Sequence, residues 1–226
     1  MCDRSIKVPH KIQGANKLLA GFYEEDMLVE EKNAQIIQPI IKHPLTCKWV
    51  MWFFKNDKNK AWSENLKTVH SFEYVEDFWA VYNYLRPVSS LHAGCDYSLF
   101  KEGIQPMWED PKNMDGGRWM ITADPNNRRE LDSLWMETLL ALIGGEVFEN
   151  QEERICGVTV NVRFKADKLS VWTNQAENKP ATLEIGRQLC RALQLQRNIS
   201  IGYQVHADLQ THRNINFRFT MKGGQF

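Results

Sequence analysis

Several features that define other classes of protein are missing from this 226-residue chain. No CxxC pair occurs, and the cysteines are widely spaced and odd in number: Cys2, Cys47, Cys95, Cys156 and Cys190. This argues against a disulfide framework or a zinc site and favours reduced thiols. No apolar run approaches the roughly 20 residues of a membrane span, and the first residues, MCDRSIKVPHK, lack a secretion signal. We therefore expect a soluble cytoplasmic protein without a membrane partner, the nucleus remaining open as a second compartment.

Net charge and enzyme motifs are also absent. The 28 Lys and Arg residues balance 28 Asp and Glu residues, so charge alone cannot hold nucleic acid, and any such contact must be small and local. There is no GxxxxGK[ST], GxSxG or HExxH motif, and acidic residues do not cluster as a magnesium site requires. The sequence therefore predicts a binding protein with no catalytic residue, metal or cofactor. A nucleotide hydrolase is the enzymatic alternative.

The order of apolar patterns predicts an α+β fold. Residues 1–39 are polar and are expected to form a flexible tail, with a brief helical stretch at Glu24–Glu31, before one domain at 40–226. The expected strands are Leu45–Phe54, Val69–Phe72, Ser98–Phe100, Arg118–Thr122, Val158–Lys165, Leu169–Thr173, Ile199–Gln204 and Asn216–Met221. The expected helices are Tyr74–Leu85, the segment from Asp124-Pro125 to Ile143, and Pro180–Leu193. This grouping indicates one antiparallel sheet with helices on one face.

Tryptophan is the residue in excess, with eight copies. Trp62 and Trp108 fall in segments without periodicity, and two such rings can sandwich a purine base, with stacking of about 1–3 kcal/mol per base. A cationic base would gain about 0.5–2 kcal/mol more from the ring quadrupoles. Glu109 follows Trp108, and one carboxylate can accept hydrogen bonds from both N1–H and the exocyclic amine of guanine. The alternative is that both indoles pack back onto the core.

The segment VTVNVRFK carries alternating side chains. Val158, Val160, Val162 and Phe164 would share one face, and Thr159, Asn161, Arg163 and Lys165 the other. Lys168 follows at the turn. Three cations and an amide on one sheet edge suit a short phosphate chain, although a solvated face is the plainer interpretation.

Two of the expected helices have apolar residues outside their core stripes. Val75 and Trp79 lie one turn apart beside the Phe78 stripe, and Met136 and Leu140 form a similar pair on the next helix. A helix that is apolar on nearly every side is either deeply buried or presents a docking face for a partner helix. The sequence leaves both possibilities open.

Taken in order, several motifs resemble one known family. The segments are HPLTCKWVMWFFKNDKNKAW, SFEYVEDFWAVYNYL, GCDYSLFKEGIQPMWED, GGRW, LWMETLLALIGG, CGVTVNVRFKADKLSVWT and IGYQVHAD. They closely resemble the eukaryotic translation initiation factor 4E family, which binds the messenger RNA cap, from about His43 to the C-terminus. The resemblance implies a curved antiparallel sheet backed by three helices on its convex face, with the cap pocket on the concave side.

The resemblance also implies roles for residues of the pocket. Trp62 and Trp108 match the pair that sandwiches the cationic 7-methylguanine, and Glu109 matches the carboxylate that reads its N1–H and amine. Trp172 matches the tryptophan near the N7-methyl group. The matches for the phosphate chain are Arg163 and Lys168, with Asn161 and Lys165 nearby.

A second surface is implied on the helices. Its residues match the dorsal surface that docks a short helix from the scaffold initiation factor 4G or from 4E-binding repressor proteins: His43, Pro44, Val75, Trp79, Met136, Glu137 and Leu140.

The expected function is binding of the 7-methylguanosine cap by a monomer that recruits the scaffold and starts cap-dependent translation. The alternative is a cap-binding repressor that does not engage the scaffold, but such a relative tends to have other aromatics at the positions of Trp49 and Trp62. The remaining tryptophans, Trp49, Trp52, Trp119 and Trp135, are assigned to the core.

Overall fold

A computed structural model of the chain describes residues 41–210 and 217–224. Contacts divide the chain into Met1–Lys42 and His43–Phe226, and the helices and strands below all belong to the second unit. The tail expected at residues 1–39 and its helical stretch at Glu24–Glu31 lie outside the described residues.

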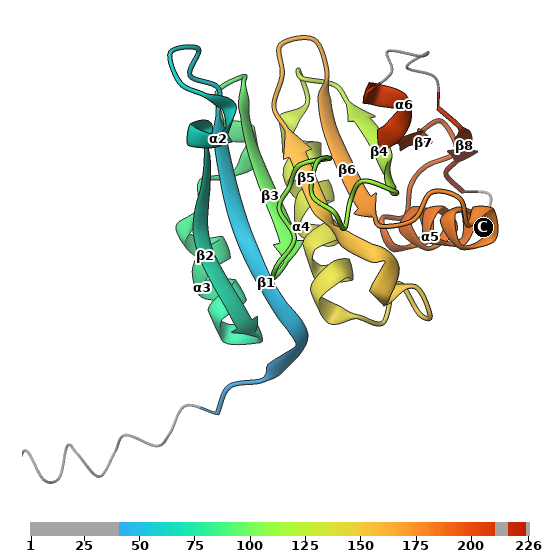
Figure 1. Cartoon of the computed structure of the whole chain (residues 1–226), viewed down its shortest axis with the longest axis horizontal. Helices are drawn as coiled ribbons and strands as arrows, with labels where there is room; N and C mark the ends of the chain where they lie inside the picture. The colour runs from blue at the N-terminus through green and yellow to red at the C-terminus, as the bar shows by residue number, and fades with distance from the viewer. Residues whose placement is uncertain (1–40, 211–216, 225–226) are drawn as a thin grey trace, which may run out of the picture. The chain divides into compact units, whose positions relative to one another are not determined.

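Eight antiparallel strands form one sheet in the order β2-β1-β3-β5-β6-β4-β7-β8 (Figure 1). Their bounds are β1 Pro44–Lys55, β2 Leu66–Tyr74, β3 Cys95–Lys101, β4 Gly117–Ala123, β5 Ile155–Asn161, β6 Asp167–Thr173, β7 Ser200–Val205 and β8 Phe219–Lys222. Strand neighbours in space are often distant in sequence: β1 pairs with β3, and β4 lies between β6 and β7. Each of the eight expected strands has a counterpart here, so the predicted antiparallel sheet is confirmed.

Strand alternation divides the sheet into two faces. One face, here called the helical face, carries fully buried side chains such as Trp49, Leu99, Val158 and Trp119. The other face, here called the open face, carries the alternate residues of the same strands. Three register rows run across it: Phe54, Asp96, Asn161, Lys168 and Thr122; Trp52, Ser98, Thr159, Ser170 and Met120; Val50, Phe100, Gly157, Trp172, Arg118 and Gln204.

Three long helices cover the helical face: α3 Val75–Tyr84, α4 Arg128–Gly144 and α5 Lys179–Ala192. The ring of Phe78 on α3 lies 5.6 Å from that of Phe72 on β2. On α5, the carbonyl oxygen of Thr182 accepts a 2.9 Å hydrogen bond from the indole nitrogen of Trp119. Figure 1 shows α3 and α4 behind the sheet. The α+β architecture with three backing helices agrees with the prediction, and the open face remains available for a ligand.

The helix starts depend on local capping. Asn178 caps α5 by accepting from the backbone N–H of Ala181 at 3.2 Å. The start of α4 at Asp124 was predicted wrongly, because α4 begins at Arg128. The Asp124 carboxylate instead accepts from the backbone N–H of Asn126 at 2.9 Å, an Asx turn that competes with the helix cap. The predicted stop is confirmed, since Gly145 follows α4 in the left-handed region at φ 77°.

Short helices and a strand end also differ from expectation. The sequence did not predict α2 (Trp62–Asn65), α6 (His206–Gln210) or the two 3₁₀ turns at Val88–Ser90 and Glu152–Arg154. The strand expected to reach Lys165 ends at Asn161. Alternation therefore does not extend to Phe164, which is 89% exposed instead of sharing the buried face of Val158.

One tryptophan assignment was wrong. Trp49, Trp119 and Trp135 are buried in the core as predicted. Trp52 is only half-buried, and it lies in the register row of Ser98 on the open face. The all-apolar run of β1 concealed this alternation. No helix in the described ranges is long and apolar enough to cross a membrane.

Candidate functional site

A cavity of about 300 Å³ opens on the open face of the sheet. Its walls come from α2, from the loop between β3 and β4, and from strands β1 to β6. The lining residues are Phe54, Trp62, Leu66, Asp96, Ser98, Pro106, Met107, Trp108, Glu109, Arg118, Thr159, Asn161 and Trp172. Four residues expected at the base-binding site, Trp62, Trp108, Glu109 and Trp172, therefore line one cavity. The volume lies at the lower end of the range for small-ligand pockets.

Trp62 is held at the rim by α2. The backbone N–H of Ala61, before the helix, donates to the Glu64 carboxylate at 2.9 Å, and the Asn65 amide donates to the carbonyl oxygen of Asp57 at 2.9 Å. The indole leans against Phe54, with ring centroids 5.7 Å apart and planes 33° apart. It nevertheless stays 48% exposed. The indole is thus fixed by its neighbours while keeping much of its surface available to a ligand.

The loop that carries Trp108 and Glu109 is built on internal hydrogen bonds. The Asp110 carboxylate accepts from the backbone N–H groups of Gln105 and Lys112, each at 2.9 Å. The fully buried Asn113 donates its amide to the carbonyl oxygens of Gln105 and Met107, each at 2.8 Å. Trp108 remains 40% exposed. The loop therefore presents the indole at the cavity without burying it in the core.

Trp172 belongs to a buried cluster at one side of the cavity. Its ring contacts Phe100 edge-on at 5.5 Å and lies 4.3 Å from the imidazole of His206. The guanidinium carbon of Arg118 lies 5.6 Å from the same ring, within the range of a cation–π contact. Trp172 is only 5% exposed, so it can present only an edge to a ligand, unlike Trp62 and Trp108.

Arg118 is a pocket residue that sequence reasoning missed. It donates to the Gln204 side-chain oxygen at 3.0 Å, and no ion pair joins it to a carboxylate in the described part of the chain. Burial lowers the pKa of the guanidinium. A desolvated cation without an acidic partner favours an anion in the cavity. The signal was present in GGRW, where strand alternation turns Arg118 away from the core residue Trp119.

His206 was also missed. It is fully buried, and neither ring nitrogen has a hydrogen-bond partner among the described residues. Burial, reinforced by the positive charge of Arg118, lowers its pKa to about 3. The imidazole is therefore neutral at physiological pH and serves as a flat neighbour for Trp172.

The expected phosphate ligands lie around the turn between β5 and β6. Asn161 lines the cavity, while Arg163 and Lys168 are half-buried and Lys165 is exposed. Because β5 ends at Asn161, alternation does not fix the directions of Arg163 and Lys165, as the sequence prediction assumed. The structure places only Asn161 of these four on the cavity wall.

Acidic residues hold this turn in place. Asp96, on the cavity wall, forms a bidentate ion pair with the Arg163 guanidinium. This pair raises the pKa of Arg163. The buried Asp167 carboxylate accepts from the Arg163 backbone N–H at 2.7 Å and from Arg128 at 2.9 Å. The pKa of Lys168 is lowered by burial and then by the cations Arg118 and Arg163. Lys168 therefore lies near two other cations, of which Arg163 is already paired with Asp96.

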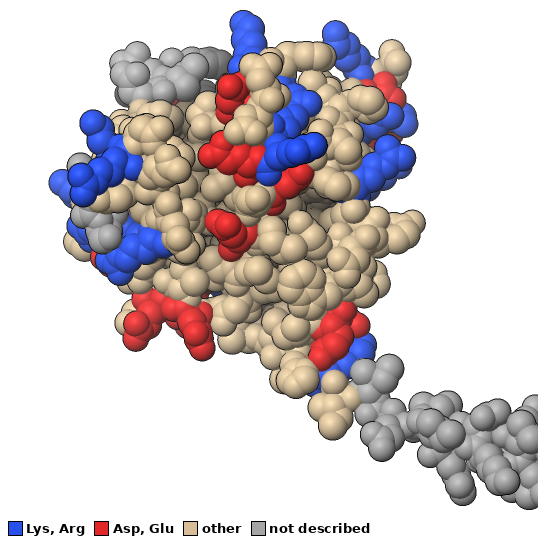
Figure 2. All heavy atoms as spheres, turned by 180° about the vertical axis from the view of Figure 1, so that it is seen from behind, with Lys and Arg blue, Asp and Glu red and all other residues tan. Residues whose placement is uncertain are grey.

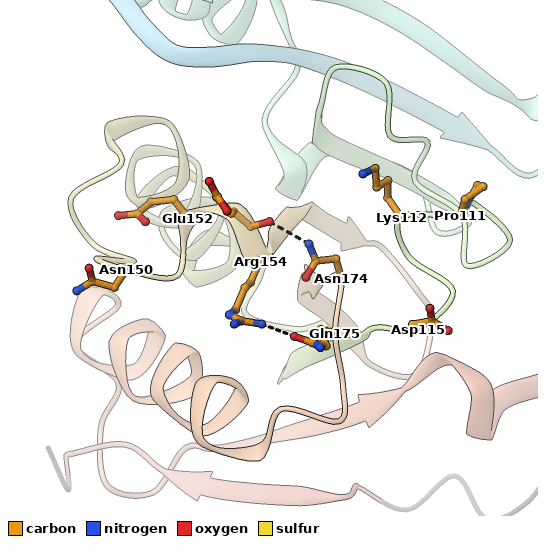
Figure 3. Close-up of a pocket in the computed structure, with 9 residues that line it drawn as sticks. Pro111, Lys112, Asp115, Asn150, Glu152, Arg154, Asn174 and Gln175 are labelled. Atoms are coloured by element: carbon orange, nitrogen blue, oxygen red, sulfur yellow. Dashed lines mark hydrogen bonds between the residues drawn. The ribbon is translucent and has the colours of Figure 1, made fainter.

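A larger hollow of about 710 Å³ lies elsewhere (Figure 3). It is lined by Pro111, Lys112, Asp115, Asn150, Glu152, Glu153, Arg154, Asn174 and Gln175. Its polar groups already bond to one another: Arg154 donates to Gln175, and Asn174 donates to the Glu153 carbonyl oxygen at 3.0 Å. It contains no aromatic ring on which a base could stack. The tryptophan cavity is therefore the better candidate site despite its smaller volume.

No cluster of His, Cys, Asp or Glu suited to a metal ion occurs in residues 41–210 and 217–224.

The surface over the helices carries the second set of predicted residues. Trp79 on α3 is 37% exposed and Leu140 on α4 is 40% exposed, while Val75 and Met136 are half-buried and Glu137 is exposed. Figure 2 shows broad uncharged areas on this side of the molecule. Trp79 contacts Phe78 edge-on at 5.1 Å, so its indole rests on the core and still reaches solvent.

The start of β1 is tied to the same helix. The backbone N–H of His43 and its ring nitrogen bond to the Glu76 carboxylate at 3.0 and 2.6 Å. These bonds lower the pKa of Glu76 to about 2. The backbone N–H of Val75 donates to the His43 carbonyl oxygen at 2.9 Å. His43 and Pro44, both exposed, are thereby held beside the first turn of α3.

Comparison with known proteins gives a consistent result. The family model for "Eukaryotic initiation factor 4E" matches residues 44–218. The human protein named eukaryotic translation initiation factor 4E is 52% identical over 184 residues, which cover 80% of this chain and 84% of the human one. The Xenopus laevis protein of the same name is 51% identical over 185 residues, covering 80% and 86%.

Solved structures show the same fold. That of Ascaris suum eIF4E-3 with an m7G cap has a TM-score of 0.76 and 43% identity, covering 80% of this chain and 98% of the other. That of C. elegans eIF4E-3 with the 4E-binding protein Mextli and a cap analog has a TM-score of 0.75 and 41% identity, covering 80% and 100%. With a family match over more than half its length and relatives above 50% identity, this chain belongs to the eukaryotic initiation factor 4E family.

Proposed function

We propose that this protein binds the 7-methylguanosine cap of messenger RNA and recruits a scaffold factor to start cap-dependent translation. The observation that carries the proposal is that Trp62, Trp108 and Glu109 line the same cavity although they come from separate elements. Two relatives support it, because their structures were solved with an m7G cap or a cap analog.

Each group has a role that follows from its chemistry. Trp62 and Trp108 stack on the two faces of the base, and Trp172 lies at its N7-methyl edge. The Glu109 carboxylate accepts from the guanine N1–H and amine, which are two donors side by side. Methylation adds positive charge but no hydrogen bond, so selectivity for the methylated base comes mainly from cation–π attraction. Binding is non-catalytic and requires no cofactor.

The phosphate chain of the cap runs toward the β5–β6 turn in this proposal. Arg163 and Lys168 contact the phosphates, with Asn161 and Lys165 nearby. Arg118 adds a partly desolvated positive charge within the cavity. A bound triphosphate would relieve the mutual repulsion of Lys168, Arg118 and Arg163, and would therefore raise the lowered pKa of Lys168.

A partner helix occupies the opposite surface in this proposal. The dorsal residues are His43, Pro44, Val75, Trp79, Met136, Glu137 and Leu140. Both the scaffold initiation factor 4G and 4E-binding repressor proteins are proposed partners. Support comes from relatives solved with the 4E-binding protein Mextli or with 4E-BP. Met136 is flexible enough to fill the apolar contact. The proposed place of action is the cytoplasm.

The cap assignment is tested by comparing 7-methyl-GTP with GTP. Tryptophan fluorescence should be quenched selectively by 7-methyl-GTP, because only the methylated base is cationic. Glu109→Gln should weaken 7-methyl-GTP about 10- to 150-fold, the loss expected when a charge-assisted hydrogen bond of about 1.5–3 kcal/mol is removed. Glu137→Gln, a carboxylate on the dorsal surface, is the matched control and should change nothing. Equal binding of GTP, or normal binding by Glu109→Gln, would show that the pocket assignment is wrong.

Recruitment is tested with a peptide that carries the scaffold's short helix. Retention of the peptide by the cap-bound protein is the expected result. A protein that binds the cap but not this peptide would instead be a translational repressor.

A further inference from the structure

We infer that Phe164 is a stacking platform for the base of the first transcribed nucleotide, the nucleoside joined to the cap through the triphosphate. This inference rests on the cap binding proposed above and extends it beyond the cap itself. The starting observation is that Phe164 is 89% exposed, more than any other large hydrophobic side chain in the described part of the chain.

The exposure of Phe164 belongs to an ordered turn. Phe164 lies between the end of β5 at Asn161 and the start of β6 at Asp167. The Asp167 carboxylate accepts from the Arg163 backbone N–H at 2.7 Å, and Arg128 donates to the Arg163 carbonyl oxygen at 3.1 Å. Both bonds hold the backbone directly before Phe164. The ring is therefore presented to solvent by a braced turn.

The neighbours of Phe164 favour nucleic acid over a protein partner. The two flanking residues, Arg163 and Lys165, are cationic, and of the next residues on either side Val162 is fully buried and Ala166 is half-buried. The sequence neighbours of the ring are therefore charged, whereas a protein docking site presents a contiguous apolar patch. An aromatic face among cations is the composition with which proteins hold single-stranded nucleic acid, since the cations follow the backbone and the ring stacks on a base. RNA recognition commonly stacks unpaired bases on such rings.

The position of the turn fits the path of the RNA. Asn161 lines the cavity, and Phe164 follows three residues later, so their Cα atoms lie at most about 11 Å apart. The proposed phosphate ligands Arg163 and Lys168 flank the same turn. Figure 1 shows this turn at the same end of the sheet as α2, which carries Trp62. A triphosphate that leaves the cavity along these cations delivers its second nucleoside to Phe164.

Binding of two ligands separates this role from cap binding itself. The probes are 7-methyl-GTP, which has no second base, and the dinucleotide cap analogue m7GpppA, measured by calorimetry with wild type and Phe164→Ala. The variant should bind 7-methyl-GTP as wild type does and bind m7GpppA about 5- to 150-fold more weakly, the range of one lost stacking contact. Phe164→Tyr should retain the binding of m7GpppA, whereas Phe164→Leu should lose it, because leucine is apolar but has no flat π-face.

The controls make every outcome decisive. Tyr84→Ala removes an equally solvent-exposed ring, 86% exposed on α3, and should leave both ligands unaffected. An analogue of m7GpppA whose second nucleoside lacks its base should bind wild type and Phe164→Ala equally. Unchanged m7GpppA affinity in Phe164→Ala overturns the inference, as does an equal loss for both ligands. Failure of wild type to bind 7-methyl-GTP would instead refute the proposed function, and the inference with it.

Discussion

Replacement of Trp108 by leucine tests how the cavity would detect the charge of a methylated base. Trp62 and Trp108 retain 48% and 40% exposure, so both indoles are accessible to a base in the free protein. Loss of one stacking face costs about 1–3 kcal/mol for any purine. The cationic base loses about 0.5–2 kcal/mol more, because its attraction to the ring quadrupole is lost as well. The sum for 7-methyl-GTP is about 1.5–5 kcal/mol, which corresponds to a loss of about 10- to 5000-fold.

The loss should be smaller for GTP, because GTP forfeits only the stacking part. The ratio of 7-methyl-GTP affinity to GTP affinity should therefore fall by about 2- to 30-fold in Trp108→Leu, which is the cation–π part alone. Leucine retains some apolar contact, so values in the lower half of each range are expected. Isothermal titration calorimetry with both nucleotides measures the two constants directly.

The matched control is Trp79→Leu, a partly exposed tryptophan on the helical side. It should leave both nucleotide affinities unchanged. An equal loss for GTP and 7-methyl-GTP in Trp108→Leu would show that this ring does not sense the charge. Unchanged affinity for both would show that it is not a wall of the binding site.

Three further predictions concern the partner surface, the phosphate path and acid stability. Trp79→Ala should abolish capture by a scaffold-helix peptide, because the Trp79 ring contacts Phe78 yet reaches solvent. The affinity for 7-methyl-GTP should stay within about twofold of wild type. Loss of both activities would mean that Trp79 supports the core. The logarithm of 7-methyl-GTP affinity should fall with the logarithm of salt concentration with a slope of about −2 to −3, as about three phosphate contacts require, and a slope near zero would argue against Arg163 and Lys168. His206 has a folded pKa of about 3 against 6.5 when exposed, so the unfolded chain binds the extra proton between these values and stability falls as pH drops through this window. Urea unfolding should show about 1.5 kcal/mol of this loss between pH 6.5 and 5, absent in His206→Asn; parallel pH profiles for the two proteins would contradict the assignment.

The sequence predicts the positions of the helices and strands better than it predicts which of them lie side by side. Strand and helix positions follow from periodicity, since alternation and the 3.6-residue repeat are local properties. That Trp62 and Trp108 line one cavity depends on β1 pairing with β3, a contact between segments distant in sequence. Local patterns carry no information on such pairing. Only the resemblance to a family brought these residues together before the structure did.

The errors have definite physical causes. The sequence predicts a helix cap at Asp124, but its carboxylate accepts from the nearer backbone N–H of Asn126 in an Asx turn. The sequence predicts Trp52 in the core because the apolar run Trp49–Phe54 hides which residues face which side of the sheet. Arg118 was overlooked because its site depends on register: it lies opposite Trp172 on the neighbouring strand. His206 was missed because a histidine that is buried and neutral looks no different in sequence from an exposed one.

The two faces of the sheet give this protein a thermodynamic property as well as a shape. Along β5, Val158 and Val160 face the helices while Thr159 and Asn161 face the cavity. With the proposed ligands on opposite faces, neither blocks the other, and both sites share the strands that lie between them. Linkage then requires reciprocity: a partner helix that tightens cap binding by some factor must itself be tightened by the cap by the same factor. The coupling free energy between the two sites can therefore be measured either as the change in cap affinity caused by the partner helix or as the change in partner affinity caused by the cap.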